Sequence, residues 1–327
     1  MTRPKVLVAN PVYGTREVPF WEPLRQAGFE VVFNDLHRRL SESELIERLP
    51  GVIGTVAGSE PYNDRVFASS PDLKVVARFG VGYDSVDVEA ATRHGVAVAM
   101  AFGTNHEAVA DYAFAHIMAQ ATSFLHHHAV VSRGTWAGGL QLGLWRRTIG
   151  IIGFGRIGKA VARRARGFEC RNLATDIAPD RDAAGRLGVE LTTLDDLLTR
   201  SDIVTIHTPK TKATTGLIGA RELGMMKPTS YIVCTARGGI IDENALVVAL
   251  SQKRIAGAGL DVFAQEPLEQ GSKLRGLDNI TLSPHCAGLD LSSERLVAER
   301  CVASILAVHR GRDPGPGLVL NPSVLHR

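Results

Sequence analysis

The chain has 327 residues, of which 45% are hydrophobic and 22% charged, and its formal net charge is +3. This length predicts about two domains, and the composition excludes a disordered, fibrous or membrane-embedded chain. The basic residues are dispersed, which argues against nucleic acid or an anionic membrane as the main partner and favours a small molecule.

The four cysteines are far apart and form no C-x-x-C pair, so we expect neither a metal site nor a disulfide framework. The N-terminal residues lead directly into the apolar segment 6–9, which is too short for the apolar region of a signal peptide. We therefore expect a cytoplasmic protein.

Five short apolar runs at the start of the chain alternate with amphipathic segments, a pattern typical of parallel β-α-β units. The predicted strands cover residues 5–9, 31–33, 52–56, 74–77 and 96–99. The alternation ends at residues 101–104, our candidate hinge. The Ala-rich stretch from Asn105 to about Arg133 then predicts one long helix.

A second alternating series follows. Its predicted strands cover residues 148–153, 171–175, 203–206, 230–234, 256–260 and 280–282, with helices at 155–167, 193–200 and 243–251. A final amphipathic helix is predicted over residues 292–309. The fold class is therefore α/β, with two doubly wound parallel-sheet domains.

A glycine-rich turn lies between the first strand and the first helix of the second series. Gly153, Gly155 and Gly158 fit the pattern G-x-G-x-x-G, with Arg156 and Ile157 between the last two glycines. The strand-turn-helix context makes this a dinucleotide-binding motif. The first glycine permits the turn, the second lets the backbone approach a pyrophosphate, and the third allows close helix packing.

An acidic residue, Asp176, ends the next predicted strand. There it would accept hydrogen bonds from the adenosine ribose hydroxyls and repel a 2′-phosphate, which favours NAD over NADP. The alternative for Asp176 is that it only caps a helix or turn.

Three ionisable residues follow three later strands of the series: Arg237, Glu266 and His285. Parallel strands bring functional groups together at their carboxyl ends. An arginine to hold a carboxylate, a histidine to move a proton and a carboxylate to orient that histidine are what reversible oxidation of a carbinol requires.

With these residues in place, the sequence resembles the D-isomer-specific 2-hydroxyacid dehydrogenase family, especially its phosphoglycerate-dehydrogenase-like branch. The resemblance extends over nearly the whole chain, in residues 73–87, 103–112, 148–158, 235–243 and 258–263, in Glu266-Pro267 and in Ser283-Pro284-His285. It implies a flavodoxin-like substrate domain made of residues 1–101 and 289–327, and a Rossmann NAD-binding domain at residues 102–288. It also implies a homodimer formed through the NAD-binding domain.

The resemblance further implies that Arg237, Glu266 and His285 are catalytic. Asp261 is expected near the nicotinamide carboxamide, and the other implied cofactor contacts are Thr208, Pro209, Thr235, Ala236 and Gly288. For the substrate carboxylate we expect the bare backbone amides of Gly80, Val81 and Gly82, with Arg78 behind them.

The expected reaction moves a hydride between nicotinamide and C2 of a small D-2-hydroxy acid or 2-keto acid. Two alternatives remain: D-3-phosphoglycerate dehydrogenase proper, and a non-catalytic NAD-sensing interaction protein of the corepressor type. The loop at residues 57–62 contains no Lys or Arg and contains Glu60, which favours an unphosphorylated substrate. Arg38, Arg39, Arg78 and Arg133 remain as alternative phosphate partners.

Overall fold

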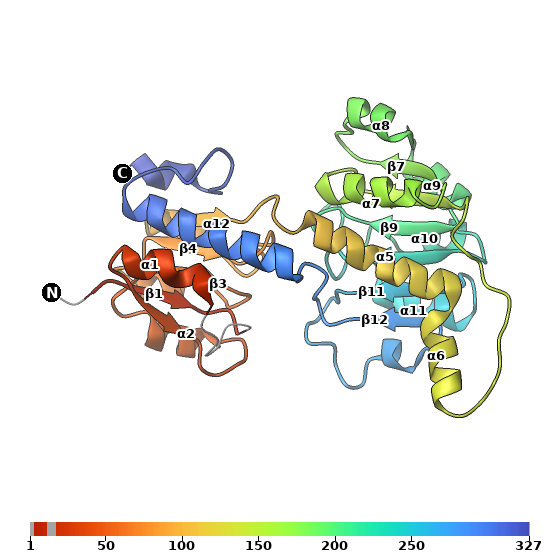
Figure 1. Ribbon diagram of the computed structural model, residues 1–327, viewed down its shortest axis with the longest axis horizontal. Coiled ribbons are helices and arrows are strands. Elements are labelled where there is room, and N and C mark those ends of the chain that lie inside the picture. Colours follow the sequence, from red (N-terminus) through yellow and green to blue (C-terminus); the bar gives the residue numbers. More distant parts are fainter. Residues whose placement is uncertain (1–2, 12–17, 327) are drawn as a thin grey trace. The chain divides into compact units, whose positions relative to one another are not determined.

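The computed structural model describes residues 3–11 and 18–326. The chain divides into two compact units (Figure 1). The first unit consists of Met1–Asn105 and Asp290–Arg327, and the second of His106–Leu289. Each contains one parallel sheet with helices on both faces, which confirms the predicted fold class.

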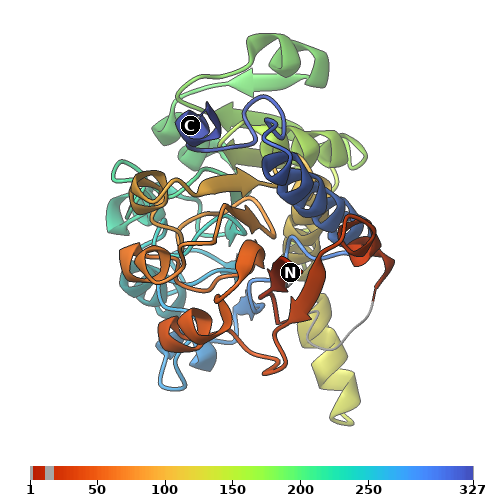
Figure 2. The same ribbon diagram turned by 90° about the vertical axis from the view of Figure 1, so that its left-hand side faces the viewer.

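The sheet of the first unit has the strand order β2-β1-β3-β4-β5. Its strands are β1 Lys5–Val8, β2 Glu30–Phe33, β3 Val52–Ala57, β4 Val75–Arg78 and β5 Ala97–Met100. Its helices are η1 Pro19–Trp21, α1 Glu22–Gln26, α2 Glu42–Arg48, α3 Asp64–Ala68, α4 Val88–Arg93, α12 Leu291–His309 and η3 Pro322–His326. Figure 2 shows α2, α3 and α4 beside one face, and α1 and α12 beside the other; each face has its own apolar core.

Helix α12 is separated in sequence from the sheet of the first unit by the whole second unit. Its N-cap Asp290 accepts a hydrogen bond from the Ser293 amide at 2.6 Å. On the buried face Ile305 packs so closely against β3 that a Cβ on Gly54 would lie 3.2 Å from it. The first core is thus completed by residues from the end of the chain.

The sheet of the second unit has the order β12-β11-β10-β9-β6-β7-β8. Its strands are β6 Thr148–Ile152, β7 Arg171–Thr175, β8 Val189–Leu191, β9 Ile203–Ile206, β10 Tyr231–Cys234, β11 Gly257–Leu260 and β12 Ile280–Leu282. Its helices are α5 His106–Thr122, α6 Phe124–Ser132, α7 Arg156–Arg166, α8 Arg181–Leu187, α9 Leu194–Arg200, α10 Ala220–Met225, α11 Glu243–Ser251 and η2 Lys273–Gly276. The strand order reverses between β6 and β9, the switch point at which such sheets bind ligands.

The prediction of one helix over residues 105–133 is wrong. The segment contains α5 and α6, which are separated at Ser123, where φ is +51°. Nine residues of α5 are buried, whereas α6 buries none. Over the described part of the chain, no helix combines the length and apolar character needed to cross a membrane.

Candidate active site

Three neighbouring strands of the second unit carry the residues that the sequence singled out. Arg237 follows β10, Glu266 follows β11 and His285 follows β12. These strands pair in parallel in that order, so their carboxyl ends lie along one edge of the sheet. The fold therefore brings the three loops together.

His285 and Glu266 are in direct contact. The Nδ1 atom of His285 lies 2.7 Å from Oε2 of Glu266, while Oε1 accepts a hydrogen bond from the Phe263 amide at 3.0 Å. Both oxygens of the carboxylate are thus engaged, and the ring is oriented through Nδ1. The side chains are 47% and 34% exposed, so the histidine remains open to solvent.

The charge state of Glu266 depends on this contact. Partial burial raises the pKa of Glu266, but the hydrogen bonds from His285 and the Phe263 amide outweigh it, and nearby Arg237 adds to them. The pKa of Glu266 is therefore lowered, and the carboxyl group is ionised when it faces the imidazole.

The loop that carries Arg237 requires glycine at the next position, Gly238. A Cβ on Gly238 would lie 1.8 Å from the carbonyl oxygen of Phe263, in the loop after β11. The guanidinium of Arg237 donates to the carbonyl of Ala236 at 2.7 Å. A planar guanidinium of this kind binds a carboxylate in bidentate fashion.

The glycine motif between β6 and α7 has the geometry that a dinucleotide requires. A Cβ on Gly153, whose φ is +93°, would lie 2.7 Å from the His207 backbone, and one on Gly158 would lie 2.2 Å from the Gly153 carbonyl oxygen. By contrast, a Cβ on Gly155 would meet no atom within 4 Å. The first and third glycines close the turn, while the second leaves open space before the N-terminus of α7, where a pyrophosphate fits.

Asp176 begins the loop after β7 and caps the local backbone. One oxygen accepts from the Phe154 amide at 2.7 Å and the other from the Ala178 amide at 2.9 Å. Asp176 therefore does cap a turn of the backbone, as the alternative to ribose binding predicted. Because each carboxylate oxygen has a second lone pair, these bonds are compatible with acceptance from ribose hydroxyls.

The other residues assigned to the cofactor lie at the same edge of this sheet. Thr208 and Pro209 follow β9, Thr235 and Ala236 follow β10, and Asp261 and Gly288 lie in loops after β11 and β12. The substrate candidates belong to the first unit, at the end of β4. There Arg78 donates to the carbonyls of Gly82 at 2.8 Å and Ala57 at 3.0 Å, and Gly80 has φ +142°.

Two buried histidines were not predicted from the sequence. His207 follows β9, and its Nε2 lies 2.9 Å from the Thr205 hydroxyl; burial lowers the pKa of His207 to about 3. His116 of α5 contacts Thr281 and Ser283. Placement of His207 directly after a strand is the one signal that could have drawn attention to it.

In the described residues no group of three or more His, Cys, Asp or Glu side chains is arranged to hold a metal ion.

Comparison with known proteins agrees with this geometry. The family model "D-isomer specific 2-hydroxyacid dehydrogenase, NAD binding domain" matches residues 114–287. The chain is 40% identical to a glyoxylate reductase from Korarchaeum cryptofilum, over 85% of this chain and 86% of that protein. It is 37% identical to a D-3-phosphoglycerate dehydrogenase from Archaeoglobus fulgidus, over 86% of this chain but 53% of that longer protein.

A similar solved structure is that of the TT0316 protein from Thermus thermophilus, with a TM-score of 0.87 and 34% identity over 97% of this chain and 99% of that one. The family and the cofactor expected from the sequence are both confirmed. The chain belongs to the D-isomer specific 2-hydroxyacid dehydrogenase family and is an NAD-dependent oxidoreductase that interconverts 2-hydroxy acids and 2-keto acids.

Proposed function

We propose that the protein reduces short, unphosphorylated 2-keto acids such as glyoxylate and hydroxypyruvate, with His285 as the proton donor. The observation that carries the proposal is the 2.7 Å contact between His285 Nδ1 and Glu266 beside Arg237. The glyoxylate reductase among the relatives supports the substrate class.

The chain's own residues have distinct parts in the proposed reaction. NAD, when bound, supplies the nicotinamide ring that gives or takes the hydride at C2. The turn at residues 153–158 binds the pyrophosphate and Asp176 the ribose. Arg237 holds the substrate carboxylate, while His285 gives a proton from Nε2 to the carbonyl oxygen in reduction and takes it back in oxidation. Glu266 accepts a hydrogen bond from Nδ1 and so orients the ring with Nε2 toward the substrate.

We assign the carboxylate-binding backbone to Gly80, Val81 and Gly82 of the discontinuous domain, residues 1–101 and 289–327, and the cofactor to residues 102–288. Arg78 acts behind that loop, because its guanidinium already bonds two backbone carbonyls.

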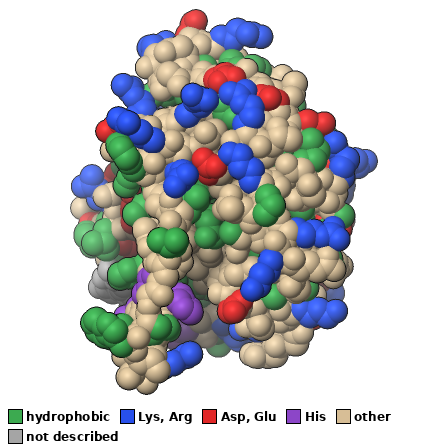
Figure 3. All heavy atoms as spheres, turned by 90° about the vertical axis from the view of Figure 1, so that its right-hand side faces the viewer, with side chains coloured by type: hydrophobic (Ala, Val, Ile, Leu, Met, Phe, Trp, Pro, Cys, Tyr) green, Lys and Arg blue, Asp and Glu red, His purple; other side chains and the backbone are tan. Residues whose placement is uncertain are grey.

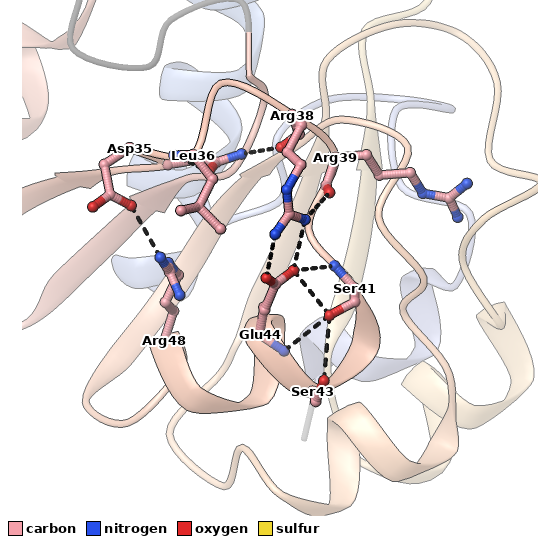
Figure 4. Close-up of polar contacts among 9 residues, drawn as sticks. Asp35, Leu36, Arg38, Arg39, Ser41, Ser43, Glu44 and Arg48 are labelled. Atoms are coloured by element: carbon pink, nitrogen blue, oxygen red, sulfur yellow. Dashed lines mark hydrogen bonds and ion pairs between the residues drawn. The ribbon is translucent and has the colours of Figure 1, made fainter. Parts of the chain in front are cut away.

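The proposed preference for an unphosphorylated substrate depends on whether basic side chains of the first unit are placed to bind a phosphate. Arg38, one candidate phosphate partner, binds Glu44 through its two terminal guanidinium nitrogens at 2.9 and 2.5 Å, and Arg39 points away from that pair (Figure 4). Glu60 differs from expectation: it is fully buried, and burial raises the pKa of its carboxyl group. The loop itself contains no Lys or Arg, and its Glu60 is buried rather than exposed; Arg78 and Arg39, outside the loop, are the cations that act on this carboxyl group.

The test is a comparison of kcat/KM for glyoxylate, hydroxypyruvate and 3-phosphohydroxypyruvate, followed at 340 nm with NADH. We expect the two unphosphorylated acids to be better substrates. A preference for the phosphorylated acid would overturn the substrate assignment, and unchanged turnover in His285→Ala would overturn the proton donor.

The proposal includes a homodimer formed through the second unit. Six large apolar side chains in and after α6 are more than half exposed: Phe124, Leu125, Val131, Trp136, Leu140 and Trp145. Figure 3 shows hydrophobic and histidine side chains side by side at the lower left of one face. Exposed apolar side chains that gather on one face are typical of an interaction surface. In sedimentation experiments Leu140→Glu should yield monomers, whereas Val248→Glu on α11 should not.

We also assign the protein to the cytoplasm. All four cysteines are free thiols, which fits a reducing compartment. Fractionation of cells expressing the tagged chain tests this assignment.

A further inference from the structure

A buried polar cluster lies next to the loop that carries His285, and of its residues only Asp261 has so far been given a part, as a cofactor contact. His116 on α5 is 5% exposed and Asp261, after β11, is fully buried. Between them lie Ser283, directly beyond β12, and Thr281 within it. All four belong to the second unit.

Asp261 fixes the conformation of the His285 loop. Its Oδ1 accepts from the Ser283 hydroxyl at 2.6 Å and the Cys286 amide at 3.0 Å, and its Oδ2 from the Ala287 amide at 2.9 Å. The Asp261 carbonyl also accepts from the His285 amide at 2.8 Å. His285 has φ +53°, a left-handed conformation that a side-chain-bearing residue keeps only when its surroundings hold it.

The hydrogen bonds of this cluster run in one direction. Because the Asp261 carboxylate is an acceptor, the Ser283 hydroxyl must donate to it and must accept from His116 Nε2, which lies 3.0 Å away. The proton of neutral His116 is then on Nε2. Its Nδ1 accepts from the Thr281 hydroxyl at 2.7 Å, and Gln120 donates to that hydroxyl oxygen at 3.3 Å.

His116 has little freedom to leave this position. A Cβ on Gly259 of β11 would lie 2.9 Å from its Cβ and Nδ1 atoms, so the ring packs directly on the strand backbone. Burial lowers the pKa of His116, which keeps the ring neutral. Two more titratable residues lie near this cluster, Tyr112 and Cys286, and the Tyr112 hydroxyl oxygen is 3.1 Å from the Cys286 Sγ atom.

We propose that His116 is a positioning residue for the reaction: its Nε2–H directs the Ser283 hydroxyl to Asp261, and Asp261 in turn holds His285 in its strained backbone conformation. This inference rests on the proposed role of His285 as proton donor. It adds a residue on α5, remote in sequence from the three active-site loops, to the groups that determine the rate.

The test combines His116→Leu, Ser283→Ala and the double variant. We expect kcat to fall about 10- to 100-fold in each single variant, because displacement of a reacting group by about 1 Å has effects of this order, while the Kd of NADH stays within twofold. If the two residues act through one series of hydrogen bonds, kcat of the double variant falls no further than kcat of the worse single variant. Multiplying losses would mean independent packing effects and would overturn the proposal.

Two further variants and one spectrum complete the test. His116→Gln retains a donor near the Nε2 position and should keep kcat within about threefold of wild type. Thr122→Val removes a hydroxyl from the same helix that bonds only its own turn, and should leave kcat unchanged. A ¹⁵N spectrum of histidine-labelled protein should show His116 as the Nε2–H tautomer; the Nδ1–H form would overturn the proposal.

If His116→Leu does not fold, Ser283→Ala and the spectrum decide the question. His285→Ala, measured in parallel, separates the two hypotheses. Wild-type turnover in that variant removes the proposed proton donor. Loss of turnover there, with wild-type kcat in Ser283→Ala, overturns only the role of His116.

Discussion

Substitution of Glu266 by glutamine tests the orientation of the proposed proton donor. The amide oxygen of glutamine can accept the Phe263 N–H bond that Oε1 now accepts at 3.0 Å. The amide nitrogen then faces His285 Nδ1, where Oε2 lies at 2.7 Å. Since that nitrogen only donates, Nδ1 of the neutral ring must become an acceptor and the ring proton must move to Nε2.

The expected decrease in kcat follows from the solvent exposure of Glu266 and His285. Enforcing the wrong tautomer beside a deeply buried carboxylate costs about 10⁴ in kcat in a serine protease. Glu266 is 34% exposed, so water can partly replace it, and we expect kcat to fall about 10² to 10³. The Kd of NADH should not change, because the glycine turn is a separate contact.

The assay is initial-rate measurement with hydroxypyruvate at 340 nm, with NADH affinity determined by fluorescence. Glu243→Gln is the matched control: Glu243 accepts from the Ala264 amide in the same loop at 2.5 Å, and glutamine can also accept there. The control should stay within twofold of wild type. More than a third of wild-type kcat in Glu266→Gln, or an equal loss in the control, would refute the reasoning.

Three more predictions follow from the second unit. Wild-type protein should prefer NADH, and Asp176→Ala should narrow the ratio of kcat/KM for NADH to that for NADPH; an unchanged ratio would speak against ribose recognition. Gly238→Ala forces a Cβ to 1.8 Å from the Phe263 carbonyl oxygen and should cost about 1–3 kcal/mol of unfolding free energy and raise KM, whereas Gly224→Ala, with no atom within 4 Å, should not. In His285→Ala the pKa of Glu266 should rise, because burial still raises it and the hydrogen bond that opposed this effect is lost. A carboxyl group with a lowered pKa in the folded state stabilises the fold above its unfolded pKa and stops doing so as the pH falls through the folded pKa; the variant should therefore lose this contribution at a higher pH, as NMR titration and acid unfolding would reveal.

The sequence predicts those parts of the site in which a residue type and a strand end coincide. Arg237 and His285 follow apolar strand segments, so the parallel-sheet topology alone places them at one edge. Ser123 gave no such signal, because nothing in an Ala-rich helical pattern marks a serine as the one residue with positive φ. The burial of Glu60 likewise depends on tertiary packing, since a Glu-Pro pair is typical of an exposed loop.

The position of α12 has a consequence for synthesis of the protein on the ribosome. Residues 3–105 emerge first, but Ile305 and its neighbours, which cover one face of their sheet, emerge only after the whole second unit. At typical elongation rates the intervening roughly 180 residues take about 10 to 40 s. During this interval Val75 and Ala97 belong to an apolar sheet face without its last helix, whereas the second unit is a contiguous stretch that can fold as soon as it is released. The unit that contains residues 3–105 is therefore the later one to complete its core, although most of its sequence is synthesised first.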